Sequence, residues 1–269
     1  MAPGPMGDGA AARRAATLRW LCLGAFVNAM TSSVMQTAQV GLGLTLASSR
    51  AQLLSTMSLL VSISSGIQFL VLPLCGVVSD TVGRKPVIVL RALISTIFPM
   101  LVVLRPSLVL VGTQRLISNC SWTLYTTSVQ ASLADVFEGK ELAVAIARTT
   151  SFEGVSRLVG PVVGGWLAAK SFRACYALSA AFGAMNIVIY GLLLPETLPS
   201  SRRRSATTGK RRERRPWAVL SPFGFLKLLR SGRELRLLTV AWTLSEICEG
   251  TYELDRHCAR TSDPWSHSR

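Results

Sequence analysis

Charged residues and glycines are concentrated in one short stretch between two long apolar segments of the chain. Residues 76–85 read Gly-Val-Val-Ser-Asp-Thr-Val-Gly-Arg-Lys. A carboxylate at Asp80 and a guanidinium at Arg84 can form a charge-assisted pair. Gly83 lies between them and permits a tight or left-handed turn that other residues resist. Arg84 could instead pair with Asp135, which follows a later apolar segment.

Further charged residues fall inside apolar segments. Glu153 and Arg157 are four residues apart on one helix face, and Arg115 lies well inside another segment. Charge in the middle of a membrane is costly. Glu153 and Arg157 therefore either neutralise each other, or Glu153 or Arg115 takes part in proton coupling or substrate binding. Polar side chains that line a cavity or hold helices together are expected at Asn28, Gln36, Gln39, Asn119, Trp122 and Tyr125.

The composition indicates a membrane protein. Charged residues make up 16% of the chain, against about 25% in a typical soluble domain. Six segments are long enough to cross a bilayer, namely residues 20–47, 57–79, 86–104, 107–133, 142–169 and 174–195. Each is predicted to be helical because a helix satisfies its own backbone polar groups in lipid. The predicted fold class is an all-α membrane protein with six transmembrane helices.

Other protein classes are not favoured. The net charge of +15 does not indicate nucleic-acid binding, because the cations lie between apolar segments, as in cytoplasmic loops. Cys22, Cys75, Cys120 and Cys175 lie within or at the ends of apolar segments without C-x-x-C spacing, which predicts neither disulfides nor a metal site. No nucleophile and base are paired in the sequence. We therefore predict no enzyme activity and no cofactor.

The chain is predicted to divide into five parts. Residues 1–17 are a disordered cytoplasmic start, 18–199 a six-helix bundle, 200–216 a basic cytoplasmic linker, 217–250 an interfacial helix with part of a seventh helix, and 251–269 an unstructured tail. A shift of reading frame would explain the composition of that tail. The excess of cations places the N-terminus and the linker in the cytoplasm. The sequence does not indicate which cellular membrane holds the protein.

The charged stretch resembles the G-x-x-x-D-x-x-G-R-[KR] loop that joins helices two and three in the major facilitator superfamily. The matching residues are Gly76, Asp80, Gly83, Arg84 and Lys85. Residues 160–165, Gly-Pro-Val-Val-Gly-Gly, resemble a helix-five signature of antiporters in that family, and Pro195-Glu196-Thr197 resembles the end of helix six. Two of the family's motifs are incomplete here: Asn119 replaces a glycine of the helix-four motif after Arg115, and Ala147 and Ser156 replace antiporter glycines.

The resemblance implies the N-terminal half of a transporter that works by alternating access, built as two inverted three-helix repeats. It implies a cytoplasmic latch made by Asp80, Arg84 and Asp135 that holds an outward-open state. It also implies helix packing through Gly160, Pro161, Gly164 and Gly165. The expected partners are the lipid bilayer, a small-molecule substrate of unspecified chemistry, a coupling proton, and a second half or a second copy.

Three alternatives remain open at this stage. The loop could be a plain connection whose cations only fix the topology. The chain could be a non-transporting or regulatory membrane fragment. It could also be a half-transporter that dimerises.

Overall fold

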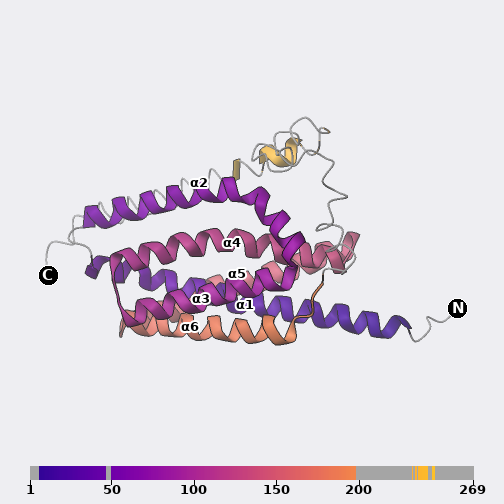
Figure 1. Cartoon of the computed structure of the whole chain (residues 1–269), viewed down its shortest axis with the longest axis horizontal. Helices are drawn as coiled ribbons and strands as arrows, with labels where there is room; N and C mark the ends of the chain where they lie inside the picture. Colours follow the sequence, from indigo (N-terminus) through magenta and orange to yellow (C-terminus); the bar gives the residue numbers. More distant parts are fainter. Residues whose placement is uncertain are drawn as a thin grey trace. The chain divides into compact units, whose positions relative to one another are not determined.

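The computed structural model describes residues 6–46 and 50–197, together with residues 232, 234, 236–241, 244 and 245. Six α-helices and one π-helix follow one another in the first two ranges (Figure 1): α1 (Met6–Leu46), α2 (Arg50–Val82), α3 (Arg84–Leu104), α4 (Leu108–Val136), α5 (Gly139–Ala168), α6 (Phe172–Val188) and η1 (Ile189–Leu193). These ranges contain no strand, and the predicted all-α class is confirmed.

The first helix is longer than predicted. It begins at Met6 rather than near residue 18, so most of the expected disordered start is helical. The segment holds several alanines and two arginines, Arg13 and Arg14, which are strong helix formers. Thr17 also donates a hydrogen bond to the Arg13 carbonyl at 2.9 Å. Helical propensity therefore extends the helix beyond its apolar part.

The predicted C-terminal parts fall mostly outside the described residues. This applies to the linker at 200–216, to the tail at 251–269 and to most of 217–250. The described residues between 234 and 245, where the seventh helix was predicted, are helical. The chain divides into two units, Met1–Arg214 and Arg215–Arg269. The helices α1 to α6 and η1 all belong to the first unit.

Not every helix has the composition of a simple membrane span. Among the described helices, α3 (21 residues, mean hydropathy 2.5) and the continuous segment Phe172–Leu193 (22 residues, mean hydropathy 1.6) are long and apolar enough to cross a bilayer. Two parts of α2, Ser58–Leu72 and Leu74–Val82, qualify together and meet at a bend of 57°. Pro73 lies at that bend, where it removes a backbone hydrogen bond. The six-span topology stays a prediction.

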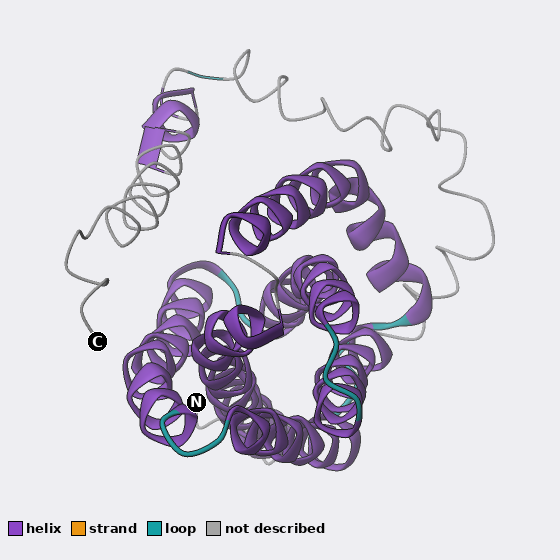
Figure 2. Ribbon diagram, turned by 90° about the vertical axis from the view of Figure 1, so that its left-hand side faces the viewer, coloured by secondary structure: helices purple, strands orange, loops and turns teal. Residues whose placement is uncertain are grey.

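The helices of the first unit form one bundle, seen from its end in Figure 2. α1 packs against α5 and α6, α4 packs against α2 and α3, and α3 also packs against α6. If α1–α3 are exchanged with α4–α6, the α1–α5 contact becomes the α4–α2 contact and α1–α6 becomes α4–α3. Two three-helix repeats related by symmetry would give this pattern.

The interior contains two clusters of buried apolar residues. One lies around Tyr125 and Tyr190, and the other around Val111 and Tyr176. Each cluster draws residues from α1, α3, α4 and α6 or its π-helical extension. The apolar faces of these helices therefore meet inside the bundle and fix the positions of the polar side chains between them.

Candidate functional site

The charged stretch forms the end of α2, the start of α3 and a single connecting residue, Gly83. Its φ of 115° and ψ of 157° lie in a region that side chains other than glycine rarely adopt. A Cβ at this position would also meet the Glu196 carboxylate at 3.0 Å. The reversal from α2 to α3 within one residue thus depends on a glycine, as the sequence predicted.

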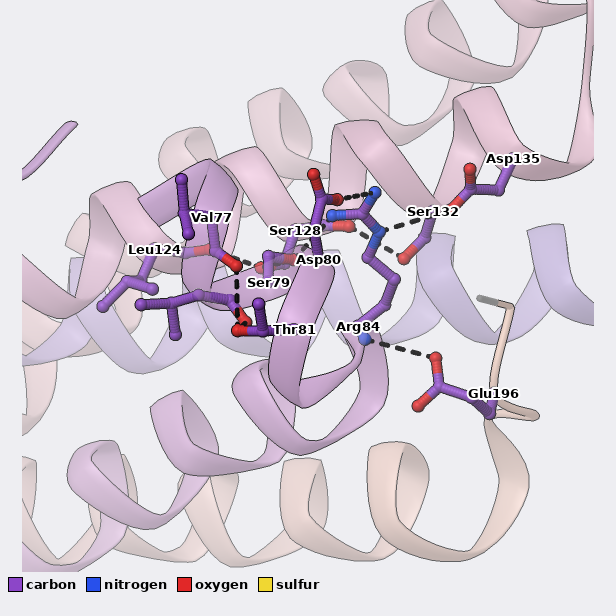
Figure 3. Close-up of polar contacts among 11 residues, drawn as sticks. Val77, Ser79, Asp80, Thr81, Arg84, Leu124, Ser128, Ser132, Asp135 and Glu196 are labelled. Carbon is purple, nitrogen blue, oxygen red and sulfur yellow. Dashed lines mark hydrogen bonds and ion pairs between the residues drawn. The ribbon is translucent and has the colours of Figure 1, made fainter. Parts of the chain in front are cut away.

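Arg84 is the centre of this site (Figure 3). Its Nη2 lies 2.7 Å from Asp80 Oδ1, and its Nε lies 3.2 Å from Asp135 Oδ2. Its Nη1 donates to Ser79 Oγ at 2.8 Å. The two acids that the sequence offered as alternative partners therefore bind the same guanidinium, and α2, α3 and α4 are joined through it.

The two ion pairs differ in their exposure to solvent. The side chains of Arg84 and Asp135 are 10% and 8% exposed, whereas that of Asp80 is 45% exposed. A pair removed from water is screened less by salt than an exposed pair. The Arg84–Asp135 pair is therefore expected to contribute the more to holding α3 against α4.

Serine hydroxyls add a second connection between α2 and α4. Ser79 Oγ and Ser128 Oγ are 3.0 Å apart, and both side chains are buried. Ser128 also donates to the Leu124 carbonyl at 2.7 Å. Ser79 receives the hydrogen bond from Arg84, so the hydroxyl pair extends the charged cluster into the bundle. The sequence analysis did not identify either serine.

Glu196, which follows α6 and η1, binds the start of α3. Its Oε1 accepts a hydrogen bond from the backbone N–H of Arg84 at 3.2 Å, and its Oε2 accepts one from the N–H of Lys85 at 3.3 Å. The first N–H groups of a helix have no partner within the helix and favour negative charge. Glu196 therefore supplies the capping group that Gly83, with no side chain, cannot provide.

The other two residues of the predicted latch have lesser roles in the geometry. Gly76 is exposed on α2, and a Cβ there would meet nothing within 4 Å. The Lys85 side chain makes no ion pair with the described residues. The cluster that the structure assembles is thus Ser79, Asp80, Arg84, Ser128, Asp135 and Glu196, here called the Arg84 cluster.

A second group of polar residues surrounds Trp122 in the bundle. The ring centroids of Trp122 and Tyr125 are 5.6 Å apart, and Tyr125 and Tyr190 share a hydroxyl–hydroxyl hydrogen bond of 2.9 Å. The guanidinium carbons of Arg91 and Arg157 lie 5.9 and 6.0 Å from the Trp122 ring centroid. The structure thus brings together Trp122, Tyr125 and Arg157, all singled out in the sequence, with Arg91 and Tyr190, which were missed.

Glu153 belongs to the same region, and it is half-buried. It interacts electrostatically with Tyr125, Tyr190 and Arg157. No ion pair within 4 Å joins Glu153 to Arg157 in the described part of the chain. Asn28 is buried on α1, and its side-chain amide lies beside the Tyr125 hydroxyl. Glu153 and Arg157 thus act on each other electrostatically without a direct ion pair.

Arg115 lies elsewhere in the bundle. Its Nη1 donates to the side-chain oxygen of Gln39 at 2.8 Å, which joins α4 to α1. The neighbouring Gln114 is buried and contacts the sulfur of Met35. Of the remaining cavity candidates, Gln36 is exposed and Asn119 is half-buried. Of the predicted polar residues, Trp122 and Tyr125 are neighbours, whereas Gln39 contacts Arg115.

Two of the helix-five glycines, Gly160 and Gly164, lie where α5 approaches α1 closely. A Cβ at Gly160 would collide with Ser33, and a Cβ at Gly164 would collide with Thr37 and the backbone of Val34. Gly165 faces open space, and Pro161 is exposed. Ser156 donates to the Phe26 carbonyl across the same interface at 2.8 Å.

Comparison with known proteins identifies the family. The family model described as Major Facilitator Superfamily matches residues 21–248. The chain belongs to the major facilitator superfamily. Members of this family are integral membrane proteins and transporters rather than enzymes, which confirms the prediction that the chain is not an enzyme.

Individual relatives agree with this assignment. The chain is 28% identical over 144 residues to the class C tetracycline resistance protein of Escherichia coli, covering 54% of this chain and 36% of the relative. It is 27% identical over 140 residues to Protein ZINC INDUCED FACILITATOR 1 of Arabidopsis thaliana, covering 46% and 28%. These matches span about a third of the relatives' length.

The fold also matches a solved structure. The crystal structure of the human organic anion transporter MFSD10 (TETRAN) superimposes with a TM-score of 0.65 and 20% sequence identity. The superposition covers 84% of this chain and 59% of that chain. At this level of identity, the match supports the superfamily fold.

Proposed function

We propose that the chain forms the N-terminal six-helix half of a secondary active transporter, which moves a small solute by alternating access and exchanges it for protons. The observation that carries this proposal is the Arg84 cluster, because one guanidinium joins the adjacent ends of α2, α3 and α4. A connection that served only to set the topology would need neither Asp80 nor a buried Asp135. The symmetric contacts of α1–α3 and α4–α6 give further support.

In this proposal the Arg84 cluster is a conformational latch at the cytoplasmic ends of the helices. Access from that side would require α2 to move relative to α4, which would separate Ser79 from Ser128 and Asp80 from Asp135. The cluster therefore favours the state that is closed to the cytoplasm. Glu196 would transmit movement of the segment after α6 directly to α3.

The region around Trp122 is the proposed site of substrate binding and proton coupling. In the proposed topology Glu153 lies in a membrane-spanning helix, where binding a proton would remove a charge that is costly in lipid. It interacts electrostatically with Tyr125, Tyr190 and Arg157. A change in the charge of Glu153 would therefore be felt by groups on α4, α5 and the end of α6.

The topology is part of the proposal. The N-terminus and the basic linker would lie in the cytoplasm, and all six helices would cross the membrane. The relatives are named for tetracycline resistance, zinc induction and organic anion transport, so their names indicate no single cargo. A second half or a second copy of the chain would close the substrate cavity.

The proposal can be tested in proteoliposomes that contain the full chain and a trapped pH-sensitive dye. Addition of a transported solute is expected to move protons, and Glu153→Gln is expected to abolish that signal. Glu138→Gln is a matched control, because Glu138 is exposed at the start of α5 and makes no side-chain cap. No proton movement with any solute, for the chain alone or with a second half, would favour a non-transporting fragment.

A further inference from the structure

Two guanidinium groups from different helices lie beside the Trp122 ring of α4. Arg91 of α3 and Arg157 of α5 approach the ring centroid to 5.9 and 6.0 Å. Both distances are within the range of a cation–π contact. Two cations beside one indole repel each other, so this arrangement needs compensation by negative charge or by hydrogen-bond acceptors.

Arg91 is the inner of the two cations, and the residue is only 4% exposed. Its Nη1 donates to Ser121 Oγ at 3.0 Å, and its Nη2 donates to Ser32 Oγ at 3.4 Å. Its Nε has no hydrogen-bond partner. Neither serine carries charge, and the tyrosines that also interact with Arg91, Tyr125 and Tyr190, contribute hydroxyl groups. A positive charge buried among hydroxyls and an indole is costly within a membrane.

Arg157 is the outer cation and its side chain is exposed. It makes no ion pair within 4 Å among the described residues. Glu153, the carboxylate nearest along α5, also interacts with the Tyr125–Tyr190 pair. The region thus contains two arginines and one carboxylate, and it has a net positive charge beside the half-buried aromatic side chain of Trp122.

We infer that Arg157 and Trp122 form a subsite for an anionic group, such as a carboxylate, that is attached to a flat apolar ring. The guanidinium of Arg157 binds the carboxylate through two parallel hydrogen bonds, and the ring of the ligand packs on the exposed indole surface of Trp122. Arg91, which is buried, supplies a second positive charge beside the same indole. This inference rests on the proposed transport function, since it names the substrate class of that site.

The test compares three probes that share one ring system and differ in charge. Naphthoate is anionic, naphthamide is neutral and naphthylmethylammonium is cationic. Each is titrated by calorimetry into the full chain in nanodiscs of zwitterionic lipid, and binding to empty nanodiscs is subtracted. We expect naphthoate to bind about tenfold more tightly than naphthamide, since a charged hydrogen-bonded contact is lost in the amide, and the cation to bind most weakly.

Variants locate the binding. Arg157→Ala is expected to weaken naphthoate binding about tenfold, and Arg157→Lys to weaken it less, because lysine keeps the charge but lacks the planar fork. Arg148→Ala is the matched control: Arg148 is also exposed on α5, and its spacing from Arg157 places it on the opposite side of the helix. Glu153→Gln is expected to strengthen naphthoate binding by removing a competing carboxylate.

Several results would overturn the subsite. Equal affinities for the three probes, no measurable binding of naphthoate, or unchanged binding by Arg157→Ala would each do so. Because binding is measured without a gradient, the outcome is separate from the transport test. Selective naphthoate binding without proton movement would leave the subsite standing and reject transport. Proton movement together with equal binding of the three probes would support transport and reject the subsite.

Discussion

Glu196 Oε1 accepts a hydrogen bond of 3.2 Å from the backbone N–H of Arg84, although 112 residues separate the two in the chain. The contact joins the segment that follows α6 to the first residue of α3. The same Arg84 binds Asp80 and Asp135 through its side chain. Its backbone and its guanidinium thus connect α3 to three other parts of the bundle at one end.

Removal of the Glu196 carboxylate is expected to destabilise the bundle. Glu196→Ala leaves the N–H groups of Arg84 and Lys85 without these acceptors, and loss of such a cap costs about 1 kcal/mol. Unfolding in mixed micelles of dodecyl maltoside and sodium dodecyl sulfate measures the change in free energy. Glu138→Ala is the control, because Glu138 precedes α5 but its side chain caps nothing. Equal losses for the two variants would contradict the capping role.

The two acids that bind Arg84 are expected to differ in their contribution to stability. Asp135→Asn removes the charge of a side chain that is 8% exposed and should cost about 2 kcal/mol, because Arg84 keeps a buried positive charge. Asp80→Asn alters a pair whose acid is 45% exposed and should cost less than about 1 kcal/mol. The same micelle unfolding assay compares them. A greater loss for Asp80→Asn would show that burial does not determine the strength of these pairs.

Local patterns made part of this site predictable. Asp80, Gly83 and Arg84 lie within one helical turn and a tight reversal, so their spacing alone indicated a charged turn. Asp135 was predictable as a partner of Arg84, because it comes at the end of an apolar segment on the same predicted side of the membrane. The all-α class followed in the same way from the length and composition of the apolar segments, whereas the start of α1 required the helical propensity of an alanine-rich segment.

Residues that act through tertiary contacts were not predictable from these patterns. Arg91 lies seven residues beyond Arg84 in an apolar segment. Only the packing of α3 against α4 and the contact of Arg91 with Ser32 of α1 show that serines and Trp122 surround it. Glu196 was noted as part of a motif, but its role depends on where the chain runs after η1. Tyr190 depends on the π-helical turn, which changes the direction of its side chain relative to a regular helix.

The Tyr125–Tyr190 hydroxyl pair is expected to contribute as a unit. Both side chains are buried, and their oxygens are 2.9 Å apart. Tyr125→Phe or Tyr190→Phe alone should cost about 1–2 kcal/mol, since each leaves a buried hydroxyl without its partner. The double variant should cost less than the sum, with a coupling of about 0.5–1 kcal/mol. Unfolding free energies of the four proteins test this, and strict additivity would mean that the pair contributes no stability.

Glycines on α5 offer a comparison between neighbouring positions of one helix. Gly164→Ala places a methyl group against Thr37 and the Val34 backbone of α1, so α1 and α5 must separate, at a cost of about 1–3 kcal/mol. Gly165→Ala faces open space and should be neutral or stabilising by up to about 1 kcal/mol, because alanine is the better helix former. If Gly164→Ala were as stable as Gly165→Ala in micelle unfolding, close packing of α5 on α1 would not hold these helices together. Gly160→Ala, which meets Ser33, should follow Gly164→Ala, since both glycines lie on the same face of α5.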